Sequence, residues 1–287
     1  MSANLLLDDD MKTIWESCQA GARRLAENGI ENADWESRAL LCDQLNLSLG
    51  DFLIRKTDPM DEADAALFAQ NINRRCAHVP LQHILGKAYF YGLEFNVSPS
   101  VLIPRPETEL LVEHALEALQ AGMSVLDLCT GSGCIAITVS TQCPGIKTDA
   151  SDVSSEALEV AKKNADANDA PVNFIQSDLF EGISGQYDMI LSNPPYISQA
   201  EMETLMPEVK DHDPHLALYG GIDGLDFYKK ISANAPDHLN PGGILMMEIG
   251  AGQAYDVSTL LRENDFTDIQ IIQDLNGLDR IVTGRRA

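Results

Sequence analysis

The chain has 287 residues, of which 45% are hydrophobic, so it can bury a substantial core in one large domain or two smaller ones. Its 20 Lys and Arg are outnumbered by 44 Asp and Glu, and the net charge of -24 disfavours direct binding of nucleic acid. The six cysteines include no C-x-x-C pair, which argues against a zinc ribbon or a thioredoxin-type site. We expect no metal site, because His212 and His215 flank Pro214 without further ligands nearby.

The chain begins MSANLLLDDDMK, with three consecutive leucines followed by three aspartates, so we expect no signal peptide. No apolar run reaches the ~20 residues that a helix needs to span a bilayer. We therefore expect a cytoplasmic protein without a membrane partner.

Residues 1–80 are predicted to form a small all-helical domain. In MKTIWESCQAGARRLAENGI, spacings of three and four define one face of a helix, and Gly29 suits its end. ADWESRALLCDQLNLS and MDEADAALFAQNINRRCAH repeat the pattern. The predicted buried residues are Ile14, Cys18, Ala22 and Leu25 in the first helix, and Trp35, Ala39, Leu40, Leu45, Leu67, Ile72 and Cys76 in the other two.

Residues 81–105 are predicted to form a β-hairpin linker, because AYFYGLEFNVSPSVLIP is rich in aromatic and β-branched residues around Gly92. A helix follows, with Pro106 in its first turn and Gly122 after its end. From Ser124 onward, strands alternate with helices, which is typical of a mostly parallel, doubly wound α/β sheet. TDIQIIQD and DRIVTGRR have no clear helix between them and predict an antiparallel edge hairpin.

The first chemical motif is VLDLCTGSGCIAI. A strand ends at Cys129, and Gly131-Ser132-Gly133 leads into a helix, so a ligand can approach the backbone closely. Asp152 ends the second strand, where a carboxylate can accept the hydroxyl protons of a ribose. A nicotinamide dinucleotide and S-adenosylmethionine both fit this pattern. Asp127 favours S-adenosylmethionine, because it can position an ammonium group directly or through water.

The second chemical motif, Asn193-Pro194-Pro195-Tyr196, follows the strand YDMILS. Parallel strands end at the same edge of a sheet, so this loop should emerge beside the glycine turn. The Asn193 side-chain oxygen and the Pro194 carbonyl can accept both protons of one planar NH2 group, and the prolines hold these acceptors still. Tyr196 offers an aromatic face for stacking. The alternative interpretation is a plain turn, in which Asn-Pro and Pro-Pro are common.

Together the two motifs resemble the S-adenosylmethionine-dependent methyltransferases that modify planar nitrogens. Within that class the chain is similar to the HemK/PrmC family of N5-glutamine methyltransferases, which act on peptide chain release factors. The similarity runs over most of the chain and includes PLQHILGKAYFYGLEFNV, VLIPRPETELLV, SNPPYI, GGIDGLDFYKKI, LNPGGILMMEIG and LNGLDR. It implies a Rossmann-like methyltransferase domain over residues 106–287. The helical domain carries no motif and could be a stabilising cap, but we favour a role in docking the protein substrate, because a macromolecular partner needs contact surface away from the pocket.

The resemblance also implies roles for individual residues. The methionine end of the cofactor would lie against Cys129, Thr130, Gly131, Ser132 and Gly133, the ribose against Asp152, and the adenine near Asp178 and Leu179. The substrate amide would be held by Asn193, Pro194, Pro195 and Tyr196, of which Asn193, Pro194 and Tyr196 would be catalytic and Asn193 would also border the cofactor.

Two residues depart from the family pattern. Cys129 stands where many relatives have Gly, and its small side chain should be tolerated if it points into the sheet. Leu179 stands where some relatives carry Trp, so apolar packing would replace adenine stacking. The roles of Arg105 and Glu107 stay open.

The resemblance implies methyl transfer from S-adenosylmethionine to the N5 atom of the glutamine in the Gly-Gly-Gln motif of release factors, leaving S-adenosylhomocysteine, by a monomeric enzyme. A glutamine methyltransferase of a large-subunit ribosomal protein is one alternative, but IPRPETEL stands where that family typically reads Pro-Arg-Ser-Pro. A DNA adenine-N6 methyltransferase is another, which the net charge and the lack of a target-recognition domain disfavour. A cofactor-binding regulator without activity is the non-enzyme alternative.

Overall fold

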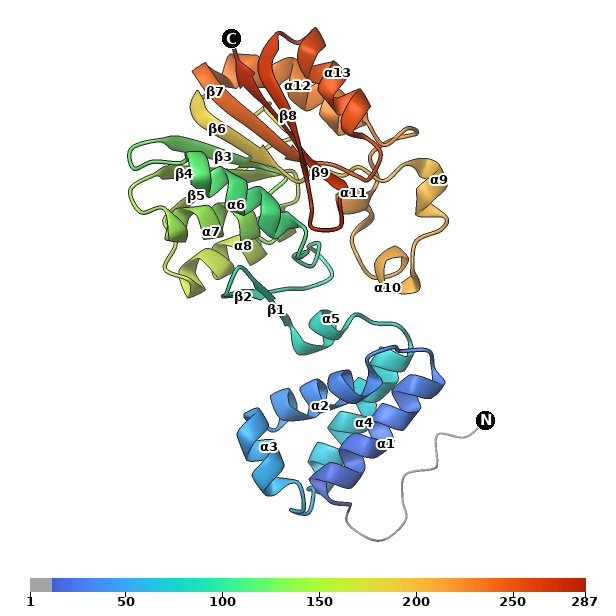
Figure 1. Ribbon diagram of the computed structural model, residues 1–287. Helices are drawn as coiled ribbons and strands as arrows, with labels where there is room; N and C mark the ends of the chain where they lie inside the picture. Colours follow the sequence, from blue (N-terminus) through green and yellow to red (C-terminus); the bar gives the residue numbers. More distant parts are fainter. Residues whose placement is uncertain (1–11) are drawn as a thin grey trace. The chain divides into compact units, whose positions relative to one another are not determined.

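The computed structural model describes residues 12–287, so nearly all of the segment on which the expected lack of a signal peptide rests lies outside the described residues. The chain divides into two compact units, of which one ends at Leu85 and the other runs from Gly86 to Ala287. Figure 1 shows the elements of both units. Within residues 12–287, no helix is both long enough and apolar enough to cross a membrane.

The first unit is helical, as the periodicity predicts. Its elements are α1 (Ile14–Glu27), α2 (Ala33–Gln44), α3 (Leu49–Arg55), α4 (Glu62–Cys76) and α5 (Leu81–Leu85). Thr13 and Ser48 each begin a helix with a reciprocal capping box, which satisfies backbone N–H groups that the first turn leaves free. The expected buried face of α1 is confirmed, and Gly29 follows its end with φ +82°.

Two residues expected inside this unit, Trp35 on α2 and Leu67 on α4, are instead exposed. For Trp35 the reason is a buried ion pair: Nε of Arg75 donates to Oε2 of Glu36 at 2.5 Å, and Nη2 of Arg75 donates to Oε1 at 3.3 Å. Successive residues point about 100° apart around a helix, so turning Glu36 inward turns its neighbour Trp35 outward. The other predicted residues of these helices are buried or partly buried: Ala39, Leu40, Leu45, Ile72 and Cys76.

The second unit contains a seven-stranded sheet with the strand order β5-β4-β3-β6-β7-β9-β8. Its strands are β3 (Ser124–Leu128), β4 (Lys147–Asp152), β5 (Val172–Gln176), β6 (Tyr187–Ser192), β7 (Leu239–Glu248), β8 (Phe266–Gln273) and β9 (Asp279–Arg286). Strands β3 to β7 pair in parallel, and β9 is antiparallel to both of its neighbours. The doubly wound sheet with an antiparallel edge hairpin is therefore confirmed. From β3 the chain winds to β4 on one side and to β6 on the other, which marks the switch point where open α/β sheets bind ligands.

Alternating side chains of the central strands enter two cores, one on each face of the sheet. On β3, Leu126 and Leu128 belong to one core and Val125 belongs to the other. The first face is covered by α12 (Asp226–His238) and α13 (Ala254–Glu263), and the second by α6 (Thr108–Ala118), α7 (Cys134–Gln142) and α8 (Ser155–Ala167) (Figure 1). Burial on both faces explains the nearly continuous apolar sequence of the central strands.

The hairpin expected within residues 81–105 is formed by β1 (Lys87–Phe90) and β2 (Leu93–Asn96), and both strands lie in the second unit. The fully buried Asn164 of α8 joins this hairpin to the turn after β3. Its Oδ1 accepts from the backbone N–H of Asn96 at 2.7 Å, and its Nδ2 donates to the carbonyls of Asn96 at 3.0 Å and Ser132 at 2.9 Å.

Three one-turn helices that the sequence pattern did not predict lie between β6 and α12. They are α9 (Gln199–Met202), α10 (Pro207–Lys210) and α11 (His215–Leu218). Four residues are too few to display helical periodicity. The segment is tied to the loop after β6, because the N–H of Ile197 donates to the Leu218 carbonyl and the N–H of Gly220 donates to the Ile197 carbonyl, both at 2.9 Å.

Candidate active site

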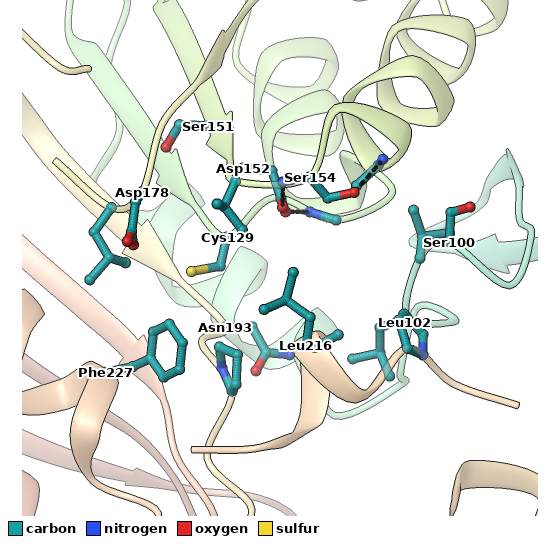
Figure 2. A pocket seen from close by; sticks show the side chains of 18 of the residues that line it. Ser100, Leu102, Cys129, Ser151, Asp152, Ser154, Asp178, Asn193, Leu216 and Phe227 are labelled. Atoms are coloured by element: carbon teal, nitrogen blue, oxygen red, sulfur yellow. Dashed lines mark hydrogen bonds between the residues drawn. The ribbon is translucent and has the colours of Figure 1, made fainter. Parts of the chain in front are cut away.

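A pocket of about 780 Å³, its open mouth included, lies at the carboxyl ends of β3, β4 and β6 in the second unit. The predicted site residues that line it, most of them labelled in Figure 2, are Cys129, Gly131, Asp152, Asp178, Leu179, Asn193 and Pro195. The structure thus brings the two chemical motifs of the sequence to one pocket.

The glycines of the turn have different tasks. Gly131 and Gly133 both have positive φ, at +54° and +83°. A Cβ on Gly133 would lie 2.9 Å from Cδ1 of Ile137 and 3.2 Å from Cβ of Ala161, whereas nothing lies within 4 Å of a Cβ on Gly131. Gly133 is therefore needed for the packing of α7, and Gly131 leaves the pocket open to a ligand.

Asp152 is held at the pocket wall by backbone groups on both sides. Its Oδ2 accepts from the N–H of Gly131 at 2.9 Å, and its Oδ1 accepts from the N–H of Ser154 at 3.0 Å (Figure 2). Burial raises the pKa of Asp152, and these hydrogen bonds oppose the increase. Each carboxylate oxygen keeps a further lone pair, so the group can still accept the two hydroxyl protons of a ribose.

Asp127 lies fully buried beneath the same turn. Its Oδ2 accepts from Oγ1 of Thr130 at 2.6 Å and from the N–H of Ala136 at 3.2 Å. Burial raises the pKa of Asp127 to about 7, although these hydrogen bonds lower it. Its Oδ1 has no hydrogen-bond partner among the described residues. Asp127 therefore braces the turn and keeps one buried acceptor free, which fits a ligand that carries an ammonium group.

The condition named for Cys129, a side chain that points into the sheet, is not met. Its side chain lines the pocket, and its sulfur lies on the side of Asp178 (Figure 2). The reason is its backbone, which takes the left-handed conformation with φ +61° directly after β3. Burial raises the pKa of the Cys129 thiol, and the carboxylates of Asp152 and Asp127 raise it further, so the thiol stays protonated at neutral pH.

Leu179 forms part of an apolar wall of the pocket, together with Phe227. It packs against the core on the first face of the sheet. Its conformation, with φ +48°, is supported by the Ser177 hydroxyl, which donates to the Leu179 carbonyl at 2.7 Å. Asp178 is exposed beside it. An aromatic base could pack against this wall without an aromatic partner at position 179.

Asn193 reaches the pocket from the end of β6, and its amide is held from behind. Its Nδ2 donates to Oγ1 of Thr108 at 3.1 Å. The buried Glu248 carboxyl adjoins Thr108 and Asn193, both of which lower its pKa, and its Oε2 has no hydrogen-bond partner among the described residues. Sequence reasoning missed Thr108 and Glu248. The available signal was a carboxylate at the end of the apolar run ILMME, at the ligand-binding edge of the sheet.

Pro194 and Pro195 are buried, and the Tyr196 ring is half-buried against the core. Nε2 of Gln253 donates to the Tyr196 carbonyl at 3.1 Å, and a Cβ on Gly250 would lie 3.1 Å from Cδ2 of the Tyr196 ring. Burial raises the pKa of Tyr196 to about 12, so its phenol is neutral at physiological pH. These contacts fix the loop after β6 in one conformation.

Arg105 makes an ion pair across the second unit. Its Nη2 donates to Oδ2 of the buried Asp213 at 2.6 Å. Arg105 follows a segment that lines the pocket, residues 100–102, and Asp213 directly precedes Pro214, another lining residue. The ion pair therefore joins two walls of the pocket, a role that the sequence left open. Among residues 12–287, no group of three His, Cys, Asp or Glu side chains is arranged to hold a metal ion.

Comparison with solved structures shows that the fold resembles that of methyltransferases. A methyltransferase from Pyrococcus furiosus superposes with a TM-score of 0.54 at 18% identity, covering 79% of this chain and 100% of that chain. A 16S rRNA methyltransferase from Thermus thermophilus, solved with AdoMet and guanosine, has a TM-score of 0.53 at 20% identity, covering 70% of this chain and 50% of that chain. At these identities the likeness concerns the fold.

Sequence comparison is more specific. Residues 16–86 match the PrmC N-terminal domain, and residues 106–212 match the methyltransferase small domain. A release factor glutamine methyltransferase of Geobacter sulfurreducens is 44% identical over 262 residues, covering 91% of this chain and 92% of that protein. One from Agrobacterium fabrum is 39% identical over 282 residues, covering 96% and 98%. The chain therefore belongs to the family of release factor glutamine methyltransferases.

Proposed function

We propose that the protein methylates the side-chain amide nitrogen of the glutamine in the Gly-Gly-Gln motif of peptide chain release factors, with S-adenosylmethionine as the methyl donor. One observation carries this proposal. The pocket that contains Gly131 and Asp152 is also lined by Asn193, so a site for a ribose-bearing cofactor and an amide-binding loop adjoin each other. The names of the relatives support the substrate class.

In this proposal different residues in and around the pocket would hold different parts of the cofactor. Asp152 would accept the ribose hydroxyls, Asp178 and Leu179 would border the adenine, and Asp127 would hold the ammonium group. The turn formed by Cys129, Thr130, Gly131, Ser132 and Gly133 would lie against the methionine end. Bound S-adenosylmethionine supplies an electrophilic methyl group.

The loop after β6 holds the nucleophile. Oδ1 of Asn193 and the carbonyl of Pro194 accept the two protons of the substrate amide, and Pro195 and Tyr196 keep the loop rigid. An amide nitrogen is a poor nucleophile because its lone pair is delocalised into the carbonyl. Two acceptors on its protons increase the electron density on nitrogen and fix its direction, so positioning provides much of the rate. The N–C bond would form as the S–C bond to the methyl group breaks, S-adenosylhomocysteine would be the leaving group, and the amide proton would then pass to water.

The helical domain, residues 1–80, is proposed to dock the protein substrate, with residues 81–105 as a linker and residues 106–287 as a monomeric methyltransferase domain. Support comes from α3, on which Leu49, Leu53 and Ile54 are exposed. A protein substrate needs contact surface beyond the small pocket, and exposed apolar side chains on one short helix suit such contact.

Mass spectrometry of a purified release factor after incubation with enzyme and S-adenosylmethionine tests the proposal. We expect one added methyl group on the Gly-Gly-Gln glutamine. Asn193→Ala should abolish turnover while largely sparing cofactor binding measured by calorimetry, and Asn234→Ala, which removes an exposed amide from α12, is the matched control. Methylation at another residue, or near-normal turnover by Asn193→Ala, would refute the assignment. Parallel assays with a large-subunit ribosomal protein and with duplex DNA identify the two alternative activities.

A further inference from the structure

Three side chains from three elements meet behind the loop after β6, which is proposed to hold the substrate. They are Thr108 at the start of α6, Asn193 after β6 and Glu248 at the end of β7. The register of the sheet explains the meeting, because Ser192 pairs with Met247 and the next residues on the two parallel strands are Asn193 and Glu248. Thr108 and Glu248 are only 2% and 3% exposed, so bulk water does not compete for their hydrogen bonds. The cluster is buried and includes the residue proposed to hold the substrate.

The donors and acceptors that these groups carry decide which group donates and which accepts each hydrogen bond. An ionised carboxylate accepts hydrogen bonds and cannot donate, whereas a hydroxyl can do both. Nδ2 of Asn193 donates to the Thr108 hydroxyl at 3.1 Å, and Oε2 of the adjoining Glu248 carboxyl is a buried acceptor that has no partner among the described residues. A hydroxyl that accepts from Asn193 is left with its own proton to donate, and the Glu248 carboxylate is the acceptor beside it. The NH2 end of Asn193 is thereby held, and Oδ1 is the atom left for a ligand. Thr108 alone would not fix this choice, because its hydroxyl could equally donate to a rotated Asn193.

We infer that Glu248, acting together with Thr108, is a positioning residue that locks the Asn193 amide with its oxygen directed at the substrate and strengthens that oxygen as an acceptor. The inference rests on the proposed function of Asn193. The strengthening follows because hydrogen bonds in a chain polarise one another, and a negative charge at one end increases the electron density on the amide oxygen at the other.

The surroundings of Glu248 make the lock dependent on pH. Burial raises the pKa of Glu248 to about 7, and Glu107 raises it too, whereas hydrogen bonds from Thr108 and Asn193 and the charge of Arg280 lower it. The uncharged phenols of Tyr196 and Tyr228 also adjoin it, and Oη of Tyr228 donates to the Glu248 carbonyl at 3.0 Å. Above neutral pH the ionised carboxylate can only accept hydrogen bonds, so the NH2 end of Asn193 must face it. At lower pH the protonated group can donate, and the orientation is no longer enforced.

Nuclear magnetic resonance of protein labelled with ¹⁵N at asparagine tests the lock without any turnover. The Asn193 side-chain NH2 signals are identified by their loss in Asn193→Ala. We expect them to shift with pH, with a midpoint near the Glu248 pKa of about 7, and to stop titrating in Glu248→Gln. Signals that do not respond to pH in the wild type, or that titrate unchanged in Glu248→Gln, overturn the inference.

Kinetics test the consequence for catalysis. Glu248→Gln and Thr108→Val should each lower kcat about 10- to 100-fold, the effect of one hydrogen bond to a charged group. The dissociation constant of S-adenosylmethionine should stay within about twofold, because the lock acts on the substrate side. Thr108→Ser keeps the hydroxyl and should recover most of the activity. Thr138→Val is the matched control, because Thr138 is an equally buried threonine of α7 whose hydroxyl donates to the Cys134 carbonyl.

The pH profile separates a positioning role from a structural one. In the wild type we expect kcat to rise as the pH rises through about 7, and this limb should vanish in Glu248→Gln. Wild-type kcat in Glu248→Gln, or equal losses in Thr108→Val and Thr138→Val, would contradict the inference. A wild-type enzyme that leaves the release factor unmethylated would instead contradict the proposed function, and the amide signals of Asn193 would still decide whether the lock exists.

Discussion

Replacing Gly133 and Gly131 separately with alanine probes the two tasks of the glycine turn. Both positions have positive φ, where an L-residue is strained by about 1–2 kcal/mol. Alanine recovers about 0.4–1 kcal/mol by restricting the unfolded chain, so a net loss of roughly 1 kcal/mol is common to both variants. Gly133→Ala also places a Cβ 2.9 Å from Cδ1 of the fully buried Ile137, and such overpacking costs about 1–3 kcal/mol more. We therefore expect losses of about 2–4 kcal/mol for Gly133→Ala and about 1 kcal/mol for Gly131→Ala.

Hydrogen exchange at the buried backbone amides of β3 measures these losses within the second unit. Cofactor titration provides the second readout. Gly131 lines the pocket, so Gly131→Ala should weaken cofactor binding by more than its effect on stability would suggest. Equal losses of stability in the two variants, or a greater loss in Gly131→Ala, would refute the assignment of packing to Gly133 and access to Gly131.

Three further predictions follow from buried polar groups. The pKa of Glu248 is raised from 4.5 to about 7, so its contribution to stability is present below about pH 4.5 and is lost as the pH rises through 7. The free energy of unfolding of Glu248→Gln relative to wild type, measured in urea, should therefore increase from pH 5 to pH 8 by up to about 3 kcal/mol. A difference that decreases over this range would contradict the prediction. The thiol of Cys129 should react with iodoacetamide at pH 8 more slowly than free cysteine although it lines the pocket, and fast alkylation seen by mass spectrometry would show that its pKa is not raised. Glu36→Gln removes the carboxylate of a buried ion pair with Arg75 and should destabilise the helical unit by about 3–5 kcal/mol in urea unfolding. Asp58→Asn breaks an exposed pair and should cost less than about 1 kcal/mol, and similar losses in the two variants would refute the distinction.

The layers of the second unit could be predicted from the sequence because each carries a local signal. Apolar runs bounded by helical periodicity define the parallel strands, and the motifs at the ends of β3 and β6 locate one edge of the sheet. This reasoning alone predicts that Asn193 and Asp152 lie at the same pocket. The same logic, applied to the end of β7, would have directed attention to Glu248.

Other features depend on contacts that local patterns do not encode. Thr108 lies far from Asn193 in the chain, and their hydrogen bond exists only because α6 covers the sheet above the end of β6. The outward turn of Trp35 depends on an ion pair between two helices. The direction of Cys129 depends on a backbone conformation that glycine usually adopts, and no neighbouring residue signals that a cysteine adopts it here.

Asn164 gives the second unit a mechanical property that its secondary structure does not reveal. One fully buried amide closes hydrogen bonds to both β2 and the glycine turn, which are separated in the chain by α6 and β3. If either segment moved away, buried donors or acceptors of Asn164 would lose their partners at a cost of about 1–3 kcal/mol. Segments coupled in this way open together rather than one at a time. The hairpin and the glycine turn therefore behave as one cooperative unit. The rigidity of the glycine turn, part of which lines the pocket, thus depends in part on a hairpin that does not line the pocket.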